Sequence, residues 1–221
     1  MQKSLEKVNS FLKENEQETK NLIKKLCLIP APSGSEDNRA LFCKNYLESV
    51  GAKNVYIDEA KNCVYPVGDL TGEIILFLSH TDTVFSDTTE TPYFEDGEYA
   101  YSPGICDNTV SVAQMLTVCK FIASNGLTPN GVGVLFVFNS CEEGMGNLKG
   151  VKHIFSRYKN KIVTAYSFDG RYDALVTKCV GSHRYKITVE TEGGHSFNAF
   201  GNKNAICTSF VLFLATFRKL P

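Results

Sequence analysis

His80 and Asp82 are the first residues of the chain whose types and spacing could do chemistry. They follow an apolar run, 74–78, which is too short to span a membrane and is typical of a strand buried on both faces. Side chains two residues apart on a strand point the same way, so both can lie at its carboxyl end, where open α/β sheets bind ligands. A carboxylate that accepts the second imidazole N–H strengthens a histidine as a metal ligand. The pair predicts a metal ligand, His80, oriented by Asp82; the alternative is a hydrogen-bonded surface pair.

Two adjacent carboxylates, Glu142 and Glu143, follow a second apolar run, 132–139. Neighbouring side chains at a strand end point to different sides. One glutamate could therefore coordinate a metal ion while the other faces the water bound to it. The alternative is a solvated pair in a loop.

Two aspartates extend this set of residues. Asp169 follows a third apolar run, 162–168, and Asp107 precedes a helix predicted over 109–124. A carboxylate is electrostatically favoured at a helix amino terminus, so the alternative for Asp107 is a plain N-cap. Each position alone could be accidental, but three strand ends and one helix start that all carry ligand-type side chains indicate a common site.

The elements that must position these side chains alternate between strands and helices. This order predicts an α/β fold: a three-layer α/β/α sandwich with a mixed, mostly parallel sheet, whose strand ends converge on one edge. One histidine with several carboxylates suits zinc, cobalt or manganese, whereas calcium prefers oxygen ligands alone. Two metal ions bridged by a carboxylate bring the pKa of bound water from about 15.7 towards about 7, so that it can attack a carbonyl. A neighbouring carboxylate would take the proton.

The other elements of the amino-terminal part follow from apolar spacing and from breaks at Pro and Gly. We expect amphipathic helices up to residue 28, a break at 29–35, a helix capped by Ser35 that ends near Gly51, strands at 55–57 and 63–65, a surface loop over 87–101 and a helix over 148–158.

Composition excludes several classes of function. The 221 residues carry a net charge of −1 with acids and bases intermingled, so neither nucleic acid nor an anionic membrane is an expected partner. The eight cysteines form no C-x-x-C pair and several lie in apolar runs, which is typical of buried reduced thiols. No apolar leader is visible within 1–25, and we expect a cytoplasmic location.

The character of the sequence changes after Asp169. Strands are predicted over 174–180 and over 184–191, where polar and apolar residues alternate, and a mostly apolar helix over 203–217. We therefore expect a metal-binding domain over 1–180 and an incomplete second domain over 181–221.

Five short motifs resemble those of the dizinc exopeptidase and deacylase family, in the same order and with similar spacing. They are Ser79–Val84, Gly104–Asn108, Glu142–Gly144, Ser167–Gly170 and Gly193–Ser196. The family includes aminoacylase, carboxypeptidase G, acetylornithine deacetylase, succinyl-diaminopimelate desuccinylase and peptidase T. The resemblance runs from about residue 30 to the end of the chain and implies that 181–221 begin an α+β lid, or dimerisation, domain.

The resemblance also implies a ligand set for two zinc ions. His80, Asp107 and Asp169 would hold one zinc ion, and Asp107 would bridge to a second zinc ion that Glu143 also binds.

Three further residues receive roles from the same resemblance. Glu142 would be the general base and later the general acid, and Asp82 would support His80. His195, in the lid, would reach into the partner subunit's site of a homodimer and stabilise the substrate oxyanion.

The sequence departs from the family pattern in one major respect. Family members carry a second histidine ligand after the lid, and nothing in this chain matches it, since His153 and His183 lie in unsuitable contexts. A smaller departure is Thr109, where many relatives have a basic residue.

These observations favour a zinc-dependent hydrolase that cleaves an amide bond in a small peptide or an N-acyl amino acid. The alternative is a truncated, inactive paralogue or fragment that binds one metal ion through His80, Asp107 and Asp169. A third possibility is an interaction scaffold with solvated carboxylates.

Overall fold

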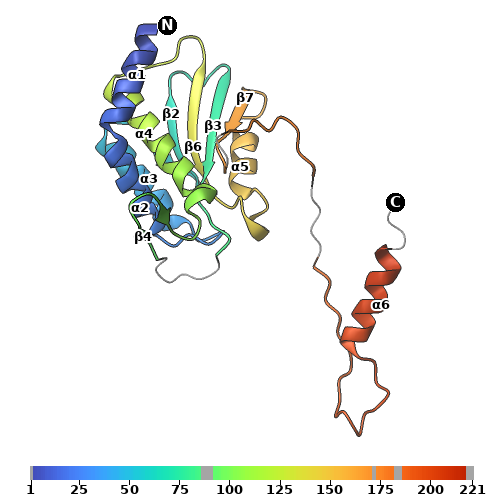
Figure 1. The fold of residues 1–221 in the computed structure, drawn as a ribbon. Helices are drawn as coiled ribbons and strands as arrows, with labels where there is room; N and C mark the ends of the chain where they lie inside the picture. The colour runs from blue at the N-terminus through green and yellow to red at the C-terminus, as the bar shows by residue number, and fades with distance from the viewer. Residues whose placement is uncertain (1, 86–91, 171–172, 182–185, 218–221) are drawn as a thin grey trace. The chain divides into compact units, whose positions relative to one another are not determined.

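The computed structural model describes residues 2–85, 92–170, 173–181 and 186–217. The chain forms two compact units, Met1–Ala174 and Leu175–Pro221, each of which is described by itself. The first unit contains the sheet (Figure 1). It also contains the residues predicted to bind metal. No helix in the described ranges has both the length and the apolar character needed to cross a membrane.

A five-stranded sheet forms the middle layer of the first unit. Its strand order is β1-β2-β6-β3-β7; β3 pairs in parallel with β6 and β7, and β2 pairs antiparallel with β1 and β6. The predicted mixed sheet is confirmed. The strands are β1 (Tyr56–Ile57), β2 (Cys63–Val67), β3 (Ile74–His80), β6 (Gly133–Asn139) and β7 (Ile162–Ser167).

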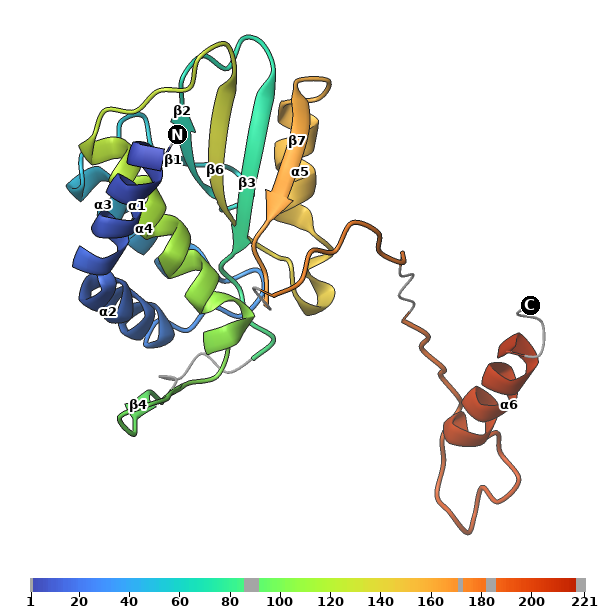
Figure 2. The same cartoon turned by 45° about the horizontal axis from the view of Figure 1, so that its top comes forward.

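Helices pack on both faces of this sheet, which confirms the predicted three layers (Figure 2). One face packs on helices α2, α3 and α4 through a cluster that includes Leu116 and Phe138. On the other face, Ile154 of α5 packs with Leu135. The helices are α1 (Gln2–Glu14), which contacts α2 and α4, then α2 (Glu16–Cys27), α3 (Asp37–Ser49), α4 (Val110–Ser124) and α5 (Lys149–Arg157).

The central strands are buried as their apolar runs predict, but β7 is not. Leu76 of β3 and Leu135 of β6 are fully buried, whereas Val163 and Tyr166 of β7 are about half exposed. Among the described strands only β3 pairs with β7, so this strand lies at an edge of the sheet. Hydrophobic sequence alone does not distinguish an edge strand from a central one.

The segment between β3 and α4 contains a hairpin where the sequence predicts only a loop. Strands β4 (Phe94–Glu95) and β5 (Ala100–Tyr101) pair antiparallel, and the rings of Phe94 and Tyr101 stack with centroids 4.6 Å apart. Two-residue strands are too short to show an alternating pattern. Residues 86–91 of the predicted loop lie outside the described residues.

The second unit contains helix α6 (Ala205–Phe217), close to the predicted range. The strand predictions for this part are wrong, because residues 174–181 and 186–191 have no regular structure. An isolated strand leaves its backbone groups unpaired, and the described residues supply no neighbouring strand. Arg184 and Tyr185 of the predicted strand lie outside the described residues. The assignment of 181–221 to a lid domain stays a prediction.

Candidate metal centre

His80 is the last residue of β3 and lies almost completely buried at the carboxyl edge of the sheet. Its Nε2 lies 3.0 Å from Asp107 Oδ1 and 3.6 Å from Asp169 Oδ1. Its Nδ1 lies 3.1 Å from the backbone carbonyl oxygen of Asp82 and 3.5 Å from the carboxylate Oδ1 of the same residue. The imidazole is thus held on one side by Asp82 and presents its other nitrogen to two carboxylates.

Asp82 connects the end of β3 to the two glutamates that follow β6. Its Oδ1 accepts a hydrogen bond from the Glu142 backbone N–H at 3.0 Å, and its Oδ2 accepts one from the Glu143 N–H at 2.9 Å. The hydroxyl of Ser33 donates to the same Oδ2 at 2.6 Å. Burial raises the pKa of Asp82, but the hydrogen bonds from His80, Ser33 and the two backbone amides outweigh it, so the net shift is downward. A buried, ionised Asp82 therefore holds the backbone of both glutamates in place beside the end of β3.

Asp107 lies in an irregular turn, η1 (Ile105–Thr109), directly before α4. The turn starts at Gly104, whose φ of 73° and close approach to Thr83 exclude a side chain: a Cβ would lie 2.6 Å from Thr83 Cγ2. Asn108 donates from Nδ2 to the Phe168 carbonyl oxygen at 2.7 Å and to Ser79 Oγ at 3.1 Å. The Asp107–Asn108 peptide bond is cis. The two hydrogen bonds of Asn108 attach the turn to the ends of β3 and β7. Asp107, which precedes Asn108 in this turn, contacts His80.

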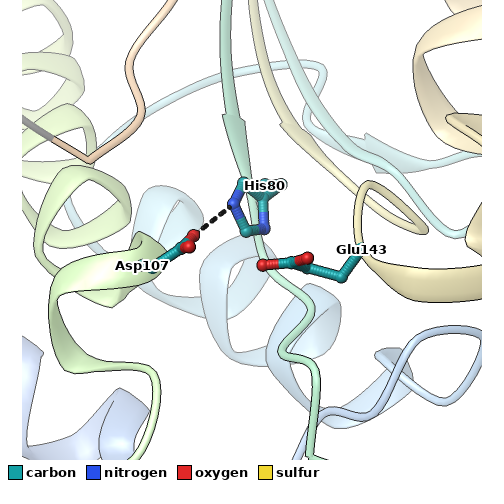
Figure 3. Close-up of side chains that lie close together, drawn as sticks. All are labelled: His80, Asp107 and Glu143. Atoms are coloured by element: carbon teal, nitrogen blue, oxygen red, sulfur yellow. Dashed lines mark hydrogen bonds and ion pairs between the residues drawn. The ribbon is translucent and has the colours of Figure 1, made fainter. Parts of the chain in front are cut away.

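Two groups of side chains around His80 could each hold a metal ion. One consists of His80, Asp107 and Glu143, and the other of His80, Glu142 and Asp169; the ligand atoms of each group lie within 4.8 Å of one another. Figure 3 shows the first group, with side chains from β3, from the turn before α4 and from the loop after β6 pointing toward one another. The structure brings all these predicted positions together, whereas the division of ligands between two ions stays a prediction.

The charge of the cluster fits a divalent cation. One imidazole faces five carboxylates, and in the described part of the chain no Lys or Arg forms an ion pair with any of them; the carboxylates are those of Asp82, Asp107, Glu142, Glu143 and Asp169. Burial lowers the pKa of His80, but its hydrogen bonds to Asp169 and Asp82 prevail and raise the pKa to about 11. Such a site attracts positive charge strongly. Mixed nitrogen and oxygen donors suit zinc, cobalt or manganese.

The two glutamates differ from solvated surface carboxylates. Burial, reinforced by Asp169, Asp82 and Asp107, raises the pKa of Glu142 despite the opposing effect of His80. Burial, Asp107 and Glu142 likewise raise the pKa of Glu143. Carboxylates whose pKa is raised toward neutrality are better proton acceptors than ordinary ones.

Three buried or half-buried polar residues near the site were missed by sequence reasoning: Ser33, Glu36 and Arg39. The sequence predicts only a helix break at Ser33 and a cap at Ser35; instead, Glu36 occupies the N-cap position of α3, without a side-chain cap hydrogen bond. Arg39 lies at helical spacing from the buried Cys43, which places it on the buried face of α3. That spacing was the available signal.

His195 belongs to the second unit, where it is exposed and its Nδ1 accepts hydrogen bonds from the backbone N–H groups of Phe197 and Asn198 at 3.2 and 3.4 Å. Its role in a partner's site stays a prediction. His183 lies outside the described residues.

A layered α/β sheet whose strand ends gather one imidazole and several carboxylates defines an α/β protein with a candidate metal centre. Residues 76–189 match the sequence model of peptidase family M20/M25/M40, and the chain belongs to this family. The matched range includes His80 and the five carboxylates that surround it.

Individual relatives agree with this assignment. A peptidase M20 domain-containing protein of Schizosaccharomyces pombe is 29% identical over 135 residues, which are 57% of this chain and 32% of the relative. The crystal structure of a tripeptidase from Staphylococcus aureus matches with 25% identity and a TM-score of 0.56, over 71% of this chain and 44% of that one. Human carnosine dipeptidase 1 shares the fold, with 17% identity and a TM-score of 0.59, over 76% and 42% of the two chains. The chain thus spans less than half the length of these relatives.

Proposed function

We propose that this chain provides the metal centre of a zinc-dependent hydrolase that cleaves an amide bond in small peptides or N-acyl amino acids. The observation that carries the proposal is the convergence of Asp107, Glu142, Glu143 and Asp169 on His80 at the carboxyl edge of the sheet. Membership of a peptidase family supports the class of reaction.

His80, Asp107, Asp169 and Glu143 would hold zinc, with Asp107 bridging if two ions bind. A divalent ion supplies positive charge that polarises a carbonyl group and acidifies water. Cobalt or manganese would fit the same donors. Asp82 keeps the imidazole and both glutamate backbones in place through its buried hydrogen bonds.

Glu142 would act as the general base. Its raised pKa places proton transfer closer to neutral pH, and its backbone N–H is fixed to Asp82, so its side chain leaves the strand end at a set position. Glu142 would take a proton from the attacking water and later return it to the leaving amine.

The names of the relatives support small peptides as substrates. The Staphylococcus aureus neighbour is a tripeptidase, and another neighbour is human carnosine dipeptidase 1. N-acyl amino acids stay the second substrate class, because the resemblance noted from the sequence includes deacylases. A homodimer of a longer form, with His195 reaching the partner's site, and a cytoplasmic location are further predictions.

The alternative is a chain that binds one metal ion without turnover. It is favoured by the single imidazole in the described clusters, where the family pattern has a second histidine ligand.

Zinc content, measured by elemental analysis, and hydrolysis of a tripeptide, a dipeptide and an N-acetyl amino acid distinguish these alternatives. The proposal expects zinc in the wild type, its loss in His80→Ala, and amide hydrolysis that Glu142→Ala abolishes with zinc content unchanged. One zinc ion per chain and no hydrolysis of any substrate would favour the alternative. A wild type without zinc would reject both.

A further inference from the structure

Arg39, in the first turn of α3, is one of the largest fully enclosed side chains in the described structure, with 2% of its surface exposed. Its Nε donates to the Ile29 carbonyl oxygen at 2.8 Å. One terminal nitrogen donates to the Thr81 carbonyl oxygen at 3.0 Å and to Thr109 Oγ1 at 3.3 Å. In the described part of the chain its hydrogen-bond acceptors are neutral, and no carboxylate forms an ion pair with it. A buried guanidinium without a paired carboxylate is costly, which indicates that it does something beyond filling space.

The acceptors of Arg39 belong to the segments that carry the metal ligands. Thr81 lies between His80 and Asp82, and Thr109 lies two residues after Asp107. A guanidinium has several donors in a rigid planar fork, so it can fix the separation of two acceptors. Arg39 therefore ties the end of β3 to the turn before α4.

The same turn of α3 also holds the third ligand segment. The carboxylate of Glu36, which is completely buried, accepts hydrogen bonds through Oε1 from the backbone N–H of Gly34 at 2.7 Å and of Cys141 at 3.0 Å. Cys141 directly precedes the two glutamates. The start of one helix thus contacts three of the four segments that meet at the cluster; the fourth, after β7, carries Asp169.

Arg39 also brings a permanent positive charge close to the acidic cluster. A guanidinium does not lose its proton in proteins. Its attraction to Asp82 is among the interactions that favour its charged form, although burial acts in the opposite sense and lowers its pKa. This charge offsets part of the repulsion among carboxylates that neither Lys nor Arg pairs with directly.

We propose that Arg39 is a positioning residue of the metal centre: by joining Thr81 to Thr109 it sets the distance between His80 and Asp107, without touching metal or substrate. The proposal rests on the proposed function, because it assigns Arg39 a purpose at that same site.

The test measures zinc affinity by calorimetry on the full 221-residue chain, beside the free energy of unfolding in a chelator. Arg39→Met removes the donors and the charge, Arg39→Lys keeps the charge but not the fork, and Thr109→Val removes one acceptor and keeps the shape. Lys120→Met is the control, since Lys120 lies on α4, the helix that follows Thr109, but pairs with Glu18 and Asn15. Thr109→Val keeps the test valid should Arg39→Met not fold.

We expect zinc affinity to fall about 10-fold or more in Arg39→Met, the range for partners of metal ligands. It should fall less in Arg39→Lys, fall measurably in Thr109→Val, and remain unchanged in Lys120→Met although that control unfolds more easily. Wild-type affinity in the folded Arg39 and Thr109 variants would overturn the positioning role and leave the proposed function intact. Absence of zinc binding by the wild type would overturn both.

Discussion

Replacing Asp82 with Asn gives the sharpest test of how this site is built. Asp82 is completely buried and accepts hydrogen bonds from two backbone amides and from Ser33, besides its contact with the imidazole of His80. An asparagine keeps one acceptor oxygen and turns the other into a donor. Whichever way the amide lies, one backbone N–H, that of Glu142 or of Glu143, then faces an NH₂ group.

The magnitude follows from these contacts. A hydrogen bond to a charged group contributes about 1.5–3 kcal/mol, and a buried N–H without an acceptor costs about 1–3 kcal/mol, contributions that overlap. We expect Asp82→Asn to lower the free energy of unfolding by about 2–4 kcal/mol in a chelator. Zinc affinity should fall about 10- to 100-fold, since the carboxylate that orients His80 is lost.

Urea unfolding in a chelator and a zinc titration measure the two effects separately. Ser33→Ala, which removes one donor and leaves both backbone contacts, should show a smaller effect of the same kind. If Asp82→Asn matched the wild type in both assays, Asp82 would not be the link between the ends of β3 and β6, and the account of the site would be wrong.

Three other predictions address stability. Gly150→Ala should lower the free energy of unfolding by about 1–3 kcal/mol in urea titrations, because its new methyl group would lie 2.5 Å from the Ser140 carbonyl oxygen; an unchanged midpoint would mean that α5 shifts freely. Burial raises the pKa of Glu18, but hydrogen bonds from Lys120 and from a tyrosine outweigh it and lower the pKa overall. Ionised Glu18 therefore stabilises the folded state above the unfolded pKa of about 4.3, and this stabilisation is lost as the pH falls. Between about pH 6 and about pH 3, the urea midpoint should fall less in Glu18→Gln than in the wild type. An equal fall in both proteins would refute this. Chelation should lower the melting temperature of the zinc-loaded chain. The free energy of unfolding should fall by about 2.7 kcal/mol if free zinc stood at about 100 times Kd. Identical melting curves would exclude a folded-state metal site.

The sequence predicted the layers and the convergence of the candidate ligands at one edge because both depend on local signals. The apolar runs that end at His80, at Asn139 and at Phe168 identify strands, and parallel strands necessarily bring their carboxyl ends to one edge. The candidate ligands could therefore be named without knowing any contact. The strands predicted after Asp169 failed because an alternating pattern forms a strand only when a neighbour pairs with it.

The residues that support the ligands were not predictable in the same way. Ser33 donates to Asp82 across 49 positions of sequence, and Arg39 reaches Thr109 across 70. No repeating pattern in the sequence signals either contact, because a single polar side chain in a loop or on a helix is equally compatible with a solvated position. Arg39 differs in that its place on the buried face of α3 could have been noticed as an anomaly.

The parallel pairing of β3 with β6 and β7 also sets the order of events as the chain folds. Residue 80 meets residue 139 and the segment near residue 168 only after long stretches of chain have closed into loops, and such distant contacts form slowly. The candidate ligands consequently come together only once β3 has paired with β6 and β7. If the proposed metal site is correct, a metal ion would stabilise the folded chain and would not direct its folding, because the ligands meet only after these strands have paired.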